Sequence, residues 1–141
     1  MKKYIICLSF LFISVGVLAQ ESLMAKSNKV FIENTSKNEK AIKTSQELEN
    51  RLKEWAYWSV VDNKEDADFV INVEPTASKG ITATSWGGTS YSLAAIFKNK
   101  EGDILWESDV YKASPNGTNG FNAGNAVVKK LIRDLKRKYS N

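Results

Sequence analysis

The segment that decides the fold covers residues 67–74 and reads Ala67-Asp68-Phe69-Val70-Ile71-Asn72-Val73-Glu74. Successive side chains of a β-strand point to opposite faces, so Phe69, Ile71 and Val73 share one face while Asn72 and Glu74 share the other. This alternation predicts a strand over 69–74. We expect its apolar face to be buried and its polar face to lie in water.

On the N-terminal side, the sequence predicts a strand, a helix and a second strand. The first strand covers Lys29–Glu33, where β-branched and aromatic residues are flanked by charge. Thr44 and Glu47 fit a capping box, and apolar residues continue after them at helical spacing. We therefore expect an amphipathic helix over Thr44–Tyr57. A short strand at Trp58–Val61 and an acidic turn at 62–68 complete this half.

On the C-terminal side, the sequence predicts a hairpin, another strand and a last helix. The hairpin covers 81–98 and reverses at 86–89, and its second strand turns Tyr91, Leu93, Ala95 and Phe97 inward. The next strand covers 103–111, with one face formed by Ile104, Trp106 and Val110. The last helix covers 121–139, and its apolar stripe is Val128, Leu131, Ile132, Leu135 and Tyr139.

The order of these elements predicts an α+β fold. Two helices separated by hairpin-linked strands favour a two-layer sandwich in the order β-α-β-β-β-β-α. We expect a mostly antiparallel sheet with both helices on one face. The chain is near the usual size of one domain, so residues 29–141 are predicted to form a single unit.

Two short motifs resemble those of small bacterial envelope domains. Ala67–Ile71 resembles the strand entry, and Gly102–Trp106 resembles the hairpin return, of the group that includes the TolB amino-terminal domain and the curli-export lipoprotein CsgG. The resemblance covers the chain from Lys29 to the last helix. It implies a scaffold or adaptor role in the cell envelope and carries no catalytic residue to this chain.

The N-terminus is typical of an export signal. Lys2 and Lys3 precede an apolar run over 4–18, and Val17-Leu18-Ala19 places small or medium residues before a cut at Gln20. The run is shorter than the roughly 20 residues of a spanning helix, and no Cys follows the cut to take a lipid. We expect a periplasmic or secreted protein with no stable transmembrane anchor, beginning with a flexible segment at 20–28.

Composition excludes several kinds of chemistry. The chain has no His, and its one Cys, Cys7, lies in the predicted signal. Imidazole bases, Ser/His/Asp and Cys/His nucleophile systems, and Cys/His zinc sites are therefore excluded from the exported chain. Four acids at 62–68 do not match a Ca²⁺ loop and read as a solvated turn. We predict no catalytic residue, metal or cofactor, with a carboxylate-dependent hydrolase as the one remaining enzymatic alternative.

Trp86 is the first candidate contact residue. It lies among small polar residues that cannot bury it locally, in the stretch Thr82-Ala83-Thr84-Ser85-Trp86-Gly87-Gly88-Thr89-Ser90. An exposed Trp at a hairpin tip suggests a protein or glycan contact, which would include Gly87, Gly88 and Tyr91. In the alternative interpretation, Trp86 folds back onto the sheet as a lid.

The C-terminal helix is the second candidate. Residues 129–141 carry a net charge of +5, whereas the exported chain as a whole carries +2. Cations near a helix C-terminus are favoured by the helix dipole, which explains part of this cluster. The functional alternative is contact with an anionic lipid, lipopolysaccharide or acidic protein. The residues concerned are Lys129, Lys130, Arg133, Lys136 and Arg137.

These observations favour a non-enzymatic interaction or accessory domain of the bacterial cell envelope. Its expected partner is an envelope protein or an anionic envelope surface, and nucleic acid is not expected because the chain carries an export signal and no nucleic-acid motif. The alternative is a small-ligand or glycan-binding module that uses the hairpin around Trp86.

Overall fold

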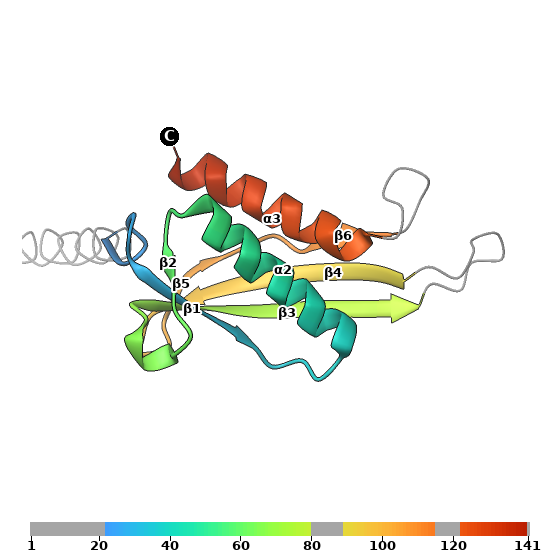
Figure 1. Ribbon diagram of the computed structural model, residues 1–141, viewed down its shortest axis with the longest axis horizontal. Helices are drawn as coiled ribbons and strands as arrows, with labels where there is room; N and C mark the ends of the chain where they lie inside the picture. The colour runs from blue at the N-terminus through green and yellow to red at the C-terminus, as the bar shows by residue number, and fades with distance from the viewer. Residues whose placement is uncertain (1–21, 80–88, 115–121, 141) are drawn as a thin grey trace, which may run out of the picture.

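The computed structural model describes residues 22–79, 89–114 and 122–140, which form one layer of helices on one sheet (Figure 1). In chain order the elements are β1 Lys29–Asn34, α2 Glu39–Trp55, β2 Ser59–Val60, a 3-10 turn Lys64–Asp66, β3 Phe69–Lys79, β4 Thr89–Lys98, β5 Ile104–Glu107, β6 Tyr111–Ala113 and α3 Ala123–Tyr139.

The sheet has the order β2-β1-β3-β4-β5, and β6 also pairs with β4. β1 runs parallel to both β2 and β3, whereas β3–β4, β4–β5 and β4–β6 are antiparallel. Both helices cover the same face of the sheet (Figure 1). The predicted α+β class, with its mostly antiparallel sheet and its helices on one side, is therefore confirmed.

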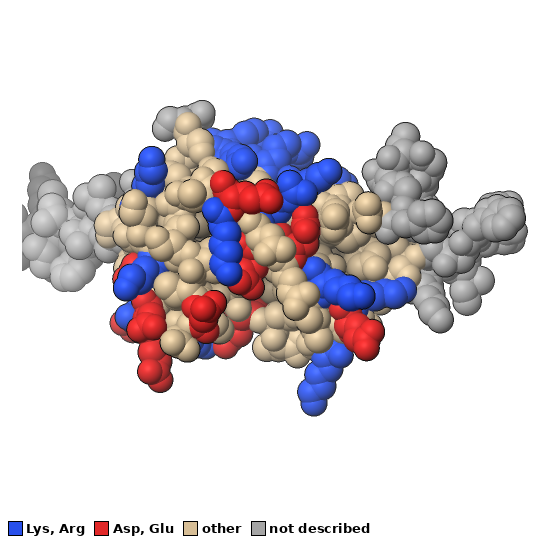
Figure 2. Space-filling view, viewed as in Figure 1, with Lys and Arg blue, Asp and Glu red and all other residues tan. Residues whose placement is uncertain are grey.

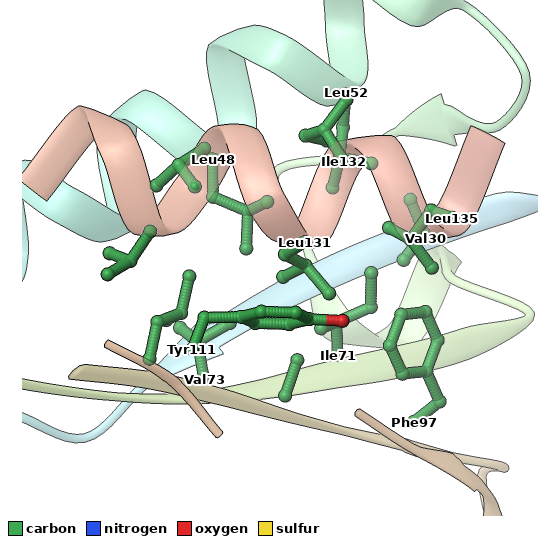
Figure 3. Packing of buried hydrophobic residues seen from close by; sticks show 14 of the residues in the cluster. Val30, Leu48, Leu52, Ile71, Val73, Phe97, Tyr111, Leu131, Ile132 and Leu135 are labelled. Atoms are coloured by element: carbon green, nitrogen blue, oxygen red, sulfur yellow. The ribbon is translucent and has the colours of Figure 1, made fainter. Parts of the chain in front are cut away.

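The core lies between this sheet face and the helices (Figure 3). The inward residues of β3 are buried, as the alternation in 69–74 predicts. Leu93, Ala95 and Phe97 of β4 are buried as well, and so is the α3 stripe from Val128 to Leu135. Each buried Leu, Ile, Val or Phe side chain contributes about 1.5–3 kcal/mol of transfer free energy, so this cluster is the main stabilising term.

Helix α2 begins earlier than predicted. Its N-cap is Asn38, whose side-chain oxygen accepts hydrogen bonds from the backbone N–H groups of Lys40 and Ala41. The predicted cap, Thr44, is instead buried inside the helix, where its hydroxyl donates to the carbonyl of Lys40 at 2.9 Å. The capping box at Thr44 is therefore wrong, because Asn38 satisfies the same free donors one and a half turns upstream.

The predicted strand over 103–111 is interrupted. Ser108 leaves the ladder, since its hydroxyl accepts from the N–H of Ala95 at 2.9 Å and donates to the carbonyl of Asp109 at 2.8 Å. Two short strands, β5 and β6, therefore replace one. The predicted common apolar face is wrong as well, because Ile104 is 49% exposed and Val110 is 59% exposed.

The segment before β1 is partly packed. Residues 20–28 were predicted to be flexible, yet Met24 is buried in the core cluster. Its carbonyl accepts a hydrogen bond from the indole N–H of Trp58 at 2.9 Å, and its sulfur accepts from the hydroxyl of Tyr139 at 3.6 Å. The packed domain thus begins before residue 29. The predicted signal over 1–19 lies outside the described residues.

No helix within residues 22–79, 89–114 and 122–140 is long and apolar enough to cross a membrane.

A basic groove between the two helices

A groove of about 650 Å³ runs between α2 and α3. It is lined by five cations, one acid and one apolar residue, which are Arg51, Glu54, Lys129, Ile132, Arg133, Lys136 and Arg137. Figure 2 shows the corresponding band of Lys and Arg side chains at the top of the molecule, above α3. Four of the five cations belong to the basic surface predicted from the sequence.

The groove's α3 wall follows from the helical repeat. Residues three or four apart lie on the same face of a helix, so Lys129, Arg133, Lys136 and Arg137 project along one side. The neighbouring face of α3 packs on the sheet through Leu131 and Leu135. Burial of that stripe therefore forces the cations outward and toward α2. The last turn of α3 is basic, which the negative end of the helix dipole favours.

Asp134, which does not itself line the groove, pairs with two of these cations. Its Oδ1 accepts from the guanidinium groups of Arg133, at 3.3 Å, and Arg137, at 2.5 Å. Its Oδ2 accepts from the hydroxyl of Tyr111 at 2.8 Å. The Tyr111 hydrogen bond, with the two arginines, holds the pKa of Asp134 below its usual range despite partial burial. Burial and the same contact raise the pKa of Tyr111. Asp134 thus stays ionised and orients both guanidinium groups.

Arg51 supplies the opposite wall from α2. Its Nε donates to Glu47 at 2.8 Å, and its Nη1 lies 3.6 Å from Glu54. The hydrogen bond and charge of Glu47 raise the pKa of Arg51. The sequence does not single out Arg51, because its proximity to the α3 cations depends on how the two helices pack. A signal was present, because Glu47, Arg51 and Glu54 have helical spacing, but it indicates only a solvated helix face.

Two cations in the groove have no acidic partner. Among the described residues, the ammonium groups of Lys129 and Lys136 make no ion pair and no hydrogen bond. Lys130, the fifth residue of the predicted basic surface, lies apart from the groove, because its ammonium donates to the carbonyl of Lys112 at 2.7 Å. The α3 wall of the groove therefore presents positive charge that ligand oxygens can neutralise, whereas Arg51 on the α2 wall is already paired with Glu47 and Glu54.

The other candidate site is only partly covered by the structure. Trp86, Gly87 and Gly88 lie outside the described residues, so their predicted contact role stays a prediction. Tyr91 is half-buried and packs against the core cluster. An added Cβ on Gly124 of α3 would lie 3.4 Å from the Tyr91 ring. This close helix approach occupies part of the ring surface that a sugar would need.

The acidic turn at 62–68 is engaged in structural contacts. Asp68 accepts from the backbone N–H of Lys29 at 2.7 Å, and Asp66 accepts from the side-chain amide of Asn63 at 3.4 Å. Across the described part of the chain, no three acidic side chains gather closely enough to hold a metal ion. Among the described residues, the groove is therefore the candidate ligand site. Its Lys and Arg donors suit an anion.

The fold recurs in known bacterial proteins. A chain of the PelC dodecamer from Paraburkholderia phytofirmans superposes with a TM-score of 0.58 at 12% identity, over 77% of this chain and 88% of that one. A DUF330 protein from Xanthomonas campestris gives a TM-score of 0.53 at 6% identity, over 82% of each chain. The lipoprotein GNA1162 of Neisseria meningitidis gives 0.51 at 11% identity, over 78% of this chain and 99% of that one.

These likenesses concern the fold alone, because each identity is low. The sequence itself matches no protein-family model and no curated protein. The comparisons support the predicted resemblance to bacterial envelope proteins. They place the fold beside PelC-like proteins and lipoproteins, however, and give no support to the TolB–CsgG group that the two motifs suggested.

Proposed function

We propose that this protein is a non-enzymatic accessory protein of the bacterial cell envelope, which acts by binding an anionic partner in the groove between α2 and α3. The observation that carries the proposal is the groove itself, where five cations from two helices face one lining acid. The export signal predicted at the N-terminus and the fold shared with a bacterial lipoprotein support an envelope location.

A binding role suits the groove's chemistry better than catalysis. Its cations are Lys and Arg, which stay protonated at neutral pH and cannot act there as general bases. Asp134 is an acid in hydrogen-bond contact with Tyr111, Arg133 and Arg137, and its lowered pKa makes it a poor proton donor or acceptor near neutrality. This group orients donors for an anionic ligand.

The test is capture of partners from a crosslinked envelope fraction. The bait is the protein or its groove variant, in which Lys129, Arg133 and Lys136 are each replaced by Gln. The matched control replaces three exposed lysines outside the groove, Lys26, Lys43 and Lys100, by Gln, so that the net charge of the two variants is equal. We expect the groove variant to lose a component that the control retains. Equal recovery by both variants would overturn the proposal.

Self-assembly is a second candidate, which the PelC dodecamer favours. β5 lies at one end of the strand order. Of the described residues, the two most exposed large apolar ones are Ile104, in β5, and Val110, directly before β6. A second copy could cover them there. Light scattering after size exclusion should then show an oligomer that Ile104→Asp with Val110→Asp dissociates. A monomer at all tested concentrations would exclude this candidate.

A further inference from the structure

Building on the proposed function, we infer that the groove takes an extended acidic segment of a partner polypeptide, in which carboxylates alternate with neutral residues. The inference concerns the class and spacing of the ligand. It depends on four properties of the groove, which are the spacing of its cations, the kind of donors it offers, its lack of exposed apolar residues and the way its arginines are held.

The spacing of the cations matches an extended chain. Lys129, Arg133 and Arg137 repeat every fourth residue along α3. At about 1.5 Å of rise per residue, neighbours in this row are about 6 Å apart along the helix axis. Alternate residues of an extended peptide are about 6.6 Å apart and point to the same side. Three alternating carboxylates therefore stay in register with three cations, with a cumulative mismatch of about 1 Å that flexible side chains absorb.

The groove is poorly suited to a single small anion. Compact phosphate sites draw on backbone N–H groups at a helix N-terminus. This groove lies along the C-terminal part of α3, where the dipole is negative, and its donors are side chains. The side chains of Arg133 and Arg137 are 65% and 71% exposed, so each contact with one anion is weak. Useful affinity requires several anionic groups on one ligand.

The groove is also poorly suited to a membrane surface. Interfacial helices combine cations with apolar side chains that enter the lipid. The exposed large apolar residues among the described ones are Ile42, Ile104 and Val110, and none of them lines the groove. The groove's own apolar residue, Ile132, is buried. Its cations also face one another across two helix walls, which suits a chain lying between them.

The anchored arginines favour carboxylate as the ligand group. A guanidinium group presents its donors in a planar fork that matches both oxygens of a carboxylate. Asp134 binds Arg133 and Arg137 and so limits the orientations that the two forks can take. Because these guanidinium groups are already held, the two arginine side chains lose less conformational entropy when a ligand binds. Lys129 then neutralises the third carboxylate of the row, and Lys136 adds a mobile positive charge to the same wall.

Titration calorimetry at low salt tests the inference with two seven-residue peptides of identical composition, three Glu and four Ser. One peptide alternates Ser and Glu, and the other has three consecutive Glu in its centre. We expect the purified protein to bind the alternating peptide about tenfold more tightly, the equivalent of one charge-assisted contact. Equal affinities would overturn the inference. So would tighter binding to phosphatidylglycerol vesicles or to a polyuronate at equal charge concentration.

Two variants locate the binding site. Arg133→Gln should remove most of the preference for the alternating peptide, and Arg133→Lys should restore only part of it because the fork is lost. The control, Lys100→Gln, should leave the preference within about twofold. A preference that survives Arg133→Gln would place the peptide elsewhere and refute the inference.

The outcome is separable from that of the envelope capture experiment. If a partner is captured through the groove but the two peptides bind equally, only the inferred ligand class fails. If the peptides discriminate but the groove variant captures the same components as the control, the proposed function fails while the groove's preference stands.

Discussion

Replacing Tyr111 by Phe tests whether the hydrogen bond between Tyr111 and Asp134 is as strong as its geometry indicates. The hydroxyl of Tyr111 donates to Asp134 at 2.8 Å, while its ring lies in the core cluster at 8% exposure. Phenylalanine keeps the ring and removes only the donor. We expect the free energy of unfolding at pH 7 to fall by about 1.5 kcal/mol.

That magnitude follows from what remains after the substitution. A hydrogen bond to a charged group contributes about 1.5–3 kcal/mol, and the upper end applies when the partner is left without any contact. Asp134 keeps Arg133 and Arg137, so the lower end applies. For a domain of this size the melting temperature should fall by about 5 °C. Tyr57→Phe is the control, because the Tyr57 hydroxyl has no hydrogen-bond partner among the described residues, and it should change stability by less than about 0.5 kcal/mol.

Urea unfolding at several pH values gives an independent test of the same reasoning. The pKa of Asp134 is lowered in the folded protein, first of all by the Tyr111 hydroxyl. Its stabilising contribution is therefore present above the unfolded-state pKa, about 3.9, and is lost as pH falls through the lower folded value. The difference between the wild-type protein and Tyr111→Phe should be largest near neutral pH and shrink as pH falls below the unfolded-state pKa of about 3.9. A difference under about 0.5 kcal/mol at pH 7, or one independent of pH, would refute the argument.

Three further substitutions test the fold by urea unfolding. Leu131→Ala should cost about 3–4 kcal/mol because it opens a cavity at a fully buried position between α3 and the sheet, and a loss below 1.5 would contradict that packing. Asn38→Ala should lower the free energy of unfolding by about 1 kcal/mol because it removes the N-cap of α2. An unchanged stability would show that Asn38 is not the residue that caps the helix. Gly124→Ala should not raise the free energy of unfolding by the roughly 1 kcal/mol expected from helix propensity, because the new Cβ would lie 3.1 Å from the Thr44 hydroxyl. In a Thr44→Ala background the same change should become stabilising, and identical effects in both backgrounds would exclude the close contact.

The buried faces of β3, β4 and α3 could be predicted from sequence because their apolar residues are regularly spaced. Helix α2 shows where this signal weakens. Its buried face begins with Ala41, Thr44 and Ser45, which are small or polar and do not stand out from a loop. Thr44 and Ser45 can be buried because their hydroxyls donate to the carbonyls of Lys40 and Ala41, four residues earlier. The first turns of the helix therefore look hydrophilic in sequence.

Only the α3 side of the groove could be predicted from the sequence. The cations of α3 are visible as a cluster of charge, but the sequence does not say what faces them. Arg51 joins them through the packing of α2 against α3, a tertiary contact between residues roughly 80 positions apart in the chain. Tyr111 was likewise assigned only to a strand, and its contact with Asp134 depends on where β6 meets α3. Spacing within one element does not contain such information.

The contact between Met24 and Tyr139 joins the first and last parts of the domain, 115 positions apart. The two ends of the packed chain therefore lie together beside Trp58. The indole N–H of Trp58 donates to the carbonyl of Met24, and its ring packs edge-on against the ring of Tyr139. Because Met24 and Tyr139 are in contact, a short linker could join the two ends of the packed domain without disturbing the sheet. Fraying from either end disrupts the same cluster, which couples the start of the chain to the end of the helix that carries the basic groove.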